Sequence, residues 1–131
     1  MNSASSHTIT GSLSNTGTVT NNGSLTSNSS LVNSDTVTMG PGSTSTISNA
    51  FTNSAGVTLD ATANLNVGGS YTQTLGTTTL NGTISATGGL TFEQGILNGG
   101  GIIDGDLSVG AATIAPGFPL GTLTVTSNTA F

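Results

Sequence analysis

Apolar residues recur at every sixth position in the first third of the chain, at Leu13, Val19, Leu25, Leu31 and Val37, among residues that are mostly Ser, Thr, Asn and Gly. A period of six matches neither an α-helix nor a simple alternating strand. It is the spacing expected when each side of a stacked, polygonal coil consists of one short strand and one corner. The pattern therefore predicts a parallel β-solenoid with three hexads in each coil.

The second half of the chain returns to the same phase. Equivalent sides of stacked coils are expected eighteen residues apart, as Ile84 and Ile102 are, and as Ile96 and Ile114 are. Successive strand residues face opposite ways, so each anchor is expected to point inward and its two neighbours outward. The predicted core-stacking residues are Leu13, Val19, Leu25, Leu31, Val37, Ile84, Leu90, Ile96, Ile102, Ile114 and Leu120.

Two stretches depart from this phase. The run Met39-Gly40-Pro41-Gly42 predicts a bulging corner, and paired apolar positions between Phe51 and Leu80 predict longer sides with two inward residues each. We therefore expect an all-β fold, a right-handed, single-stranded parallel β-helix of about seven coils, each of about 18 residues or slightly more. It should form one domain over residues 1–131, with a polar tail at 1–7. A left-handed hexapeptide helix is the alternative, and the evenly spaced anchors argue against disorder.

The charge balance restricts the possible partners. The 131 residues contain no Lys or Arg, five Asp or Glu, one His and no Cys. Nucleic-acid binding needs cationic groups that displace phosphate counterions, and anionic membrane surfaces attract the same groups, so we expect neither partner. No apolar run reaches the roughly 20 residues of a membrane span, so no membrane insertion is expected. Without cysteine there is no disulfide framework from which a redox compartment could be inferred.

Two acidic side chains are the main candidates for chemistry. Asp104 and Asp106 are two residues apart, which puts them on one face if the segment is extended, at a spacing that some glycosidases use. Asp-Gly-Asp is also ordinary corner chemistry, in which carboxylates accept backbone hydrogen bonds. We therefore expect a structural role, with Asp104 and Asp106 as weak candidates for calcium. His7, which has no second His or Cys to share a metal, is expected to be a solvated residue of the tail.

Outward threonine pairs resemble the flat threonine arrays of ice-binding solenoids. Such a site needs threonine ranks that stack on one face in successive coils, whereas only the first two pairs are eighteen residues apart. Ice binding is therefore kept as an alternative function. The four pairs are Thr18 with Thr20, Thr36 with Thr38, Thr72 with Thr74, and Thr122 with Thr124.

The abundant asparagines suggest a second kind of regular array. In stacked coils their amides can form ladders along the axis, each bonded to the copies above and below. Such a ladder would stabilise the fold and would not carry out chemistry.

Two segments resemble exported bacterial surface proteins. SLSNTGTVTNNGSLTSNSS resembles the L-x-N-x-G-T-hydrophobic-x repeats of filamentous haemagglutinin-type adhesins. LNGGGIIDGDLSVGAATIAPGFPLGTLTV resembles autotransporter passengers, in which a G-x-I-x-G-D-L segment precedes a PG-x-x-x-GTL-x-V segment. The resemblance implies a right-handed β-helix, secretion and a role at the cell surface.

The predicted function is an extracellular structural or adhesive element of a bacterial cell surface. A parallel solenoid leaves unpaired backbone groups on its first and last coils, so we expect head-to-tail self-association into a fibre, or continuation into a longer adhesin. Cell-surface carbohydrate is a possible partner, and a carbohydrate-active β-helix is a further alternative. We expect no enzymatic activity, no catalytic residue and no cofactor.

Overall fold

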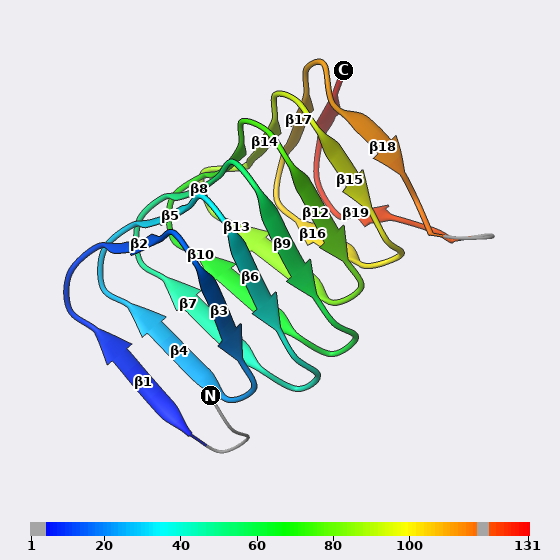
Figure 1. The fold of residues 1–131 in the computed structure, drawn as a ribbon. Coiled ribbons are helices and arrows are strands. Elements are labelled where there is room, and N and C mark those ends of the chain that lie inside the picture. Colours follow the sequence, from blue (N-terminus) through cyan, green and yellow to red (C-terminus); the bar gives the residue numbers. More distant parts are fainter. Residues whose placement is uncertain (1–4, 118–120) are drawn as a thin grey trace.

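The computed structural model describes residues 5–117 and 121–131, and its described residues form twenty short strands and no helix (Figure 1). The strands build three parallel sheets. Sheet A contains β1 (Ser6–Ile9), β4 (Ser24–Ser27), β7 (Thr44–Ile47), β10 (Asn64–Val67), β13 (Thr83–Ala86), β16 (Ile102–Asp104) and β19 (Thr124–Val125). Sheet B contains β2 (Leu13–Asn15), β5 (Leu31–Asn33), β8 (Phe51–Asn53), β11 (Tyr71–Gln73), β14 (Leu90–Phe92), β17 (Leu107–Val109) and β20 (Thr129–Ala130). Sheet C contains β3 (Thr18–Asn21), β6 (Thr36–Met39), β9 (Gly56–Leu59), β12 (Thr77–Leu80), β15 (Ile96–Asn98) and β18 (Thr113–Ala115).

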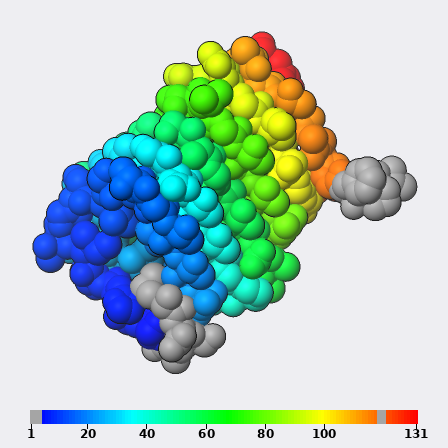
Figure 2. Space-filling model, viewed as in Figure 1, coloured from blue at the N-terminus to red at the C-terminus, as the bar shows by residue number. Residues whose placement is uncertain are grey.

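Every strand pairs with the strand three places away along the chain, which confirms the predicted parallel β-solenoid. The chain contributes one strand to each sheet in turn and then starts the next coil (Figure 1). The coils contain about 19 residues and make about six turns, compared with the seven expected. The colour bands of the space-filling view follow one another from the first coil to the last, as expected when each coil packs only against its neighbours (Figure 2).

The core lies between the three sheets and consists of stacked ranks of inward side chains. Five of the predicted anchors are buried in it, namely Leu25, Leu31, Val37, Ile84 and Leu90. Leu13, Val19 and Ile114 are partly buried and pack against this core. Leu120 lies outside the described residues.

Three aromatic residues supply the largest core side chains. Phe51, Tyr71 and Phe92 are fully buried and lie in successive coils of sheet B. Their ring centroids are 5.1 Å apart between Phe51 and Tyr71 and 5.7 Å apart between Tyr71 and Phe92, with tilted planes. Such tilted aromatic neighbours are stabilising beyond the area that they bury.

The prediction was wrong for Ile96 and Ile102, which point outward with 41% and 42% of their surface exposed. Their neighbours Leu97 and Ile103 occupy the core instead. The corner at 93–95 has three residues, whereas the corner at 34–35 has two, so the alternation of faces is displaced by one residue after it. Counting in sixes from Leu90 therefore selects Ile96 and Ile102, whereas the buried residues are the next ones along the chain, Leu97 and Ile103.

The longer corners require glycine. Gly76 and Gly95 have positive φ of 89° and 88°, and they stack on one another in successive coils. A Cβ at Gly95 would lie 2.0 Å from the Gly76 carbonyl oxygen, so no side chain fits there. A corner was predicted over Met39-Gly40-Pro41-Gly42; it lies at 40–43, between β6 and β7, and Met39 is the last residue of β6.

Candidate functional site

Asp104 and Asp106 lie at a corner and not on one strand face, because β16 ends at Asp104 and β17 begins at Leu107. The intervening Gly105 has a φ of 144°. Asp104 Oδ1 accepts a hydrogen bond of 2.9 Å from the Thr126 hydroxyl. The glycosidase-like spacing required Asp104 and Asp106 to lie on one extended segment, and they do not.

Asp106 holds the last coil in place. Its Oδ1 accepts hydrogen bonds from the Ser127 hydroxyl, from the Asn128 backbone N–H at 3.1 Å and from Asn128 Nδ2 at 3.3 Å. These bonds stabilise the charged form, so the pKa of Asp106 lies below its usual value, with the Ser127 hydroxyl as the largest cause. The carboxylate is thus engaged in the corner interactions that the sequence predicted for it.

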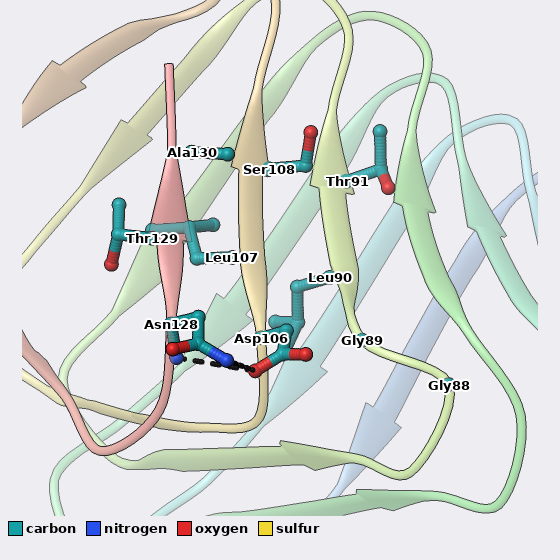
Figure 3. A pocket seen from close by; sticks show the side chains of 10 residues that line it. All are labelled: Gly88, Gly89, Leu90, Thr91, Asp106, Leu107, Ser108, Asn128, Thr129 and Ala130. Atoms are coloured by element: carbon teal, nitrogen blue, oxygen red, sulfur yellow. Dashed lines mark hydrogen bonds between the residues drawn. The ribbon is translucent and has the colours of Figure 1, made fainter.

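A shallow hollow of about 250 Å³ lies beside Asp106, over the outer face of β14, β17 and β20 (Figure 3). Figure 3 shows Thr91, Ser108 and Ala130 along its floor and Asp106 bonded to Asn128 at one end. Among the described residues that line the hollow, Asp106 is the one ionisable group, and its Oδ1 accepts hydrogen bonds from the chain itself. The exposed lining of the hollow is more apolar than polar.

His7 is exposed but belongs to a strand. β1 begins at Ser6, so Ser6 and His7 form part of sheet A, although the sequence placed them in the tail. His7 pairs in register with the buried Leu25, so it occupies an inward-facing strand position in the first coil. Among the described residues there is no group of three or more His, Cys, Asp or Glu side chains that could hold a metal ion.

The outer face of sheet C carries two parallel rows of threonines, of which the eighteen-residue spacing in the sequence predicts only the first two coils. The register aligns Thr18 with Thr36 and Thr20 with Thr38, and it then adds Thr58, Thr77 and Thr79. The signal was hidden because the coils after the second are longer than eighteen residues. We call this surface the threonine face; it consists of Thr18, Thr20, Thr36, Thr38, Thr58, Thr77 and Thr79, interrupted by Gly56.

An amide ladder runs inside sheet B, as the abundance of asparagine suggested. Asn15 Nδ2 donates to Asn33 Oδ1 at 2.8 Å, and Asn33 Nδ2 donates to Asn53 Oδ1 at 2.9 Å. Asn53 Nδ2 donates to Gln73 Oε1 at 3.4 Å, which completes four rungs. The rungs are 18, 20 and 20 residues apart, and each is the third residue of a Leu-x-Asn, Phe-x-Asn or Tyr-x-Gln strand.

Gln73 ends the ladder by bonding to its own coil and the next. Its Nε2 donates to the carbonyl oxygens of Gln94, Gly76 and Ile96, and its Oε1 accepts from the Thr78 hydroxyl at 2.6 Å. The Tyr71 hydroxyl lies 2.6 Å from the Thr78 oxygen. Burial raises the pKa of the Tyr71 phenol well above its usual range, so the phenol stays protonated and can donate to Thr78.

Comparison with protein-family models, with curated protein sequences and with solved structures finds no match for this chain. The described residues include no helix that is long and apolar enough to cross a membrane. The threonine face, the amide ladder and the two ends of the solenoid are the features of the described residues that bear on function.

Proposed function

We propose that the protein is an extracellular structural or adhesive rod element of a bacterial cell surface, similar in role to filamentous haemagglutinin and autotransporter passengers. The observation that carries the proposal is the pair of open ends. β1, β2 and β3 are the first strands of their sheets, and β19, β20 and β18 are the last, within the described parts of the chain. The outer edge of β2 at one end and that of β20 at the other present backbone groups on which a further parallel strand can pair.

The open edge of β2 is defined by its existing hydrogen bonds. The Leu13 N–H donates to the Ser30 carbonyl oxygen, and the Asn15 carbonyl oxygen accepts from the Ser34 N–H. Because alternate residues of a strand bond on opposite sides, the N–H and C=O of Ser14 face away from β5. A further coil would pair there, supplied by a second copy of the chain or by neighbouring repeats of a longer surface protein.

The surface and the core suit such a rod. With no Lys or Arg and five acids, the chain has a formal charge of −5, and its outward strand positions are mostly Thr, Ser and Asn. Stability comes from a continuous apolar core and from backbone ladders along the axis. Such an element could space, display or attach other groups, including on cell-surface carbohydrate.

The test extends the chain by one coil. A second copy of residues 6–23 is inserted ahead of Ser6. This segment has the length of one coil, because Ser6 of β1 pairs in register with Ser24 of β4. We expect the added coil to dock and to protect the Ser14 N–H from hydrogen exchange. Ser14→Pro in the original coil removes this donor, so it should lower the protection of the backbone N–H in the copy of Asn15, which would pair with the residue-14 carbonyl oxygen. Ser14→Ala keeps the donor and should leave that protection unchanged. An unprotected Ser14 N–H in the extended chain would refute the proposal.

A second candidate function, ice binding, is favoured by the threonine face. Threonines of adjacent coils repeat at about 4.8 Å, and the two threonines of one strand are roughly 6.6 Å apart. The β-branched side chains are restricted in rotamer, so hydroxyl and methyl groups form a regular array. The repeats are comparable with the separations between water oxygens in the ice lattice.

The threonine face can be tested by its effect on ice recrystallisation. If it binds ice, the protein should slow recrystallisation, and Thr38→Lys or Thr58→Lys should abolish the effect. Thr72→Lys, on the outer face of sheet B, is the matched control and should have no effect. Recrystallisation at the rate of buffer alone would remove this second candidate.

A further inference from the structure

The amide ladder has a direction, and this direction determines what each end of the ladder can bind. Asn15, Asn33 and Asn53 each donate from Nδ2 to the amide oxygen of the following coil. Every rung therefore offers its oxygen toward the N-terminal end of the solenoid and its N–H groups toward the C-terminal end. The first rung presents an acceptor to whatever coil packs before it.

The first rung has an open acceptor position. Asn33 Oδ1 accepts two hydrogen bonds, one from Asn15 Nδ2 at 2.8 Å and one from the Asp35 N–H at 3.4 Å. Asn15 Oδ1 accepts one from the described residues, from the Gly17 N–H at 3.2 Å. Asn15 is otherwise buried, with 6% of its surface exposed.

We infer that the N-terminal end of the solenoid is a docking site for a parallel β-coil that carries asparagine at the position in register with Asn15. This inference rests on the proposed function, because it names the partner that the open β2 edge selects. Backbone pairing along β2 would hold any extended segment. The side-chain N–H of an asparagine would in addition donate a hydrogen bond to Asn15 Oδ1, in the same way that Asn15 Nδ2 donates to Asn33 Oδ1.

The C-terminal coil of a second copy fits this position poorly. The ladder positions of the later coils are apolar, with Gln73 paired in register with Phe92 and Phe92 with Val109. Strand β20 ends at Ala130, and the next residue in this alternation is Phe131, which is 90% exposed. In the register that continues the sheets, Phe131 would face Asn15 Oδ1 without a hydrogen to donate. The preferred partner is therefore a preceding coil that resembles residues 6–23 in carrying asparagine at the position of Asn15.

The test varies the ladder position of the added coil described above. The copy of Asn15 is kept as Asn or changed to Asp, which has the same shape but is an acceptor when ionised. At neutral pH we expect protection of the Ser14 N–H to fall about tenfold or more with Asp, because two acceptors then face each other. Acidification below about pH 4 should restore protection, corrected for intrinsic exchange, because a protonated carboxyl can donate.

A matched control separates this effect from the effect of charge. The copy of Ser14 in the added coil, which is the outward neighbour, is changed to Asp and should leave protection unchanged at both pH values. Equal protection with Asn and Asp at the ladder position would overturn the inference and leave the proposed function intact. No protection with any added coil would instead refute the proposed function.

Discussion

At the scale of single residues, the fold depends on a ladder of buried amides, of which Asn33 makes the most hydrogen bonds. The Asn33 amide donates to Asn53 Oδ1 and to the carbonyl oxygens of Asp35 and Gly56, and it accepts from Asn15 Nδ2 and the Asp35 N–H. A polar group in this position costs free energy unless it is bonded, so it accepts few substitutes. The ladder therefore specifies the register between coils as well as stabilising it.

Replacing Asn33 with Ala should destabilise the protein by about 3 kcal/mol, because the buried partners on both adjacent coils lose their hydrogen bonds. Asn66 is the matched control, since it is an exposed asparagine on the outer face of β10. Asn66→Ala should change the free energy of unfolding by less than about 0.5 kcal/mol. Urea unfolding measures both variants, and equal effects would contradict a structural ladder.

Neighbouring apolar residues provide a second test at this scale. Leu97→Ala should lower the free energy of unfolding by about 2 to 5 kcal/mol, because Leu97 is fully buried in the core. Ile96→Ala should have a much smaller effect, since Ile96 points outward from the same strand. If thermal unfolding showed a larger loss for Ile96 than for Leu97, the register of β15 would be wrong.

At the scale of elements, corners determine which face each strand presents. The corners at 74–76 and 93–95 contain three residues and end in glycines with positive φ. They stack because the Ile96 N–H donates to the Gly76 carbonyl oxygen at 2.9 Å. The last element, β20, depends on a different corner, where Asp106 accepts hydrogen bonds from Ser127 and Asn128.

The docking of β20 should depend on pH through Asp106. Because the pKa of this carboxyl is lowered in the folded protein, its contribution is present above its unfolded pKa and is lost as pH falls through the folded value. NMR should therefore show the Asn128 amide signal titrating with a midpoint below 3.8, the ordinary value for this group. In Asp106→Asn that transition should be absent, and its persistence would exclude Asp106 as the cause.

At the scale of the whole molecule, stability is expected to vary from coil to coil. Each coil contacts only its neighbours, so a coil at either end has one stabilising interface and a middle coil has two. The middle coils contain the aromatic stack and the buried end of the ladder, whereas Thr124, Thr129 and Ala130 of the last strands are exposed. The rod should therefore open from its ends.

Hydrogen exchange can measure this gradient. Amides of β8, β11 and β14 should exchange most slowly, and those of β19 and β20 most rapidly, because the end strands can separate without disturbing the core. Proteolysis by a broad-specificity enzyme should follow the same order, while trypsin has no Lys or Arg at which to cleave. Uniform exchange across all coils would indicate a single cooperative unit.

Much of the fold could be predicted because a repeated period is a property of the sequence. The hexad anchors from Leu25 to Val37, and again Ile84 and Leu90, are buried where the period places them. The period does not encode the length of each corner, and one extra residue inverts the face of every residue that follows. Ile96 and Ile102 were therefore assigned to the core in place of Leu97 and Ile103.

The sequence by itself determined the stacked, parallel, all-β architecture and the absence of Lys and Arg, and it predicted amide ladders. These follow from spacing and composition, which need no knowledge of which coils meet. The tertiary structure alone decided which residues stand above one another, because coil lengths vary along the chain. That alignment produced the threonine face, joined Gln73 to the asparagine ladder and left the oxygen of Asn15 with an open position at the end of the rod.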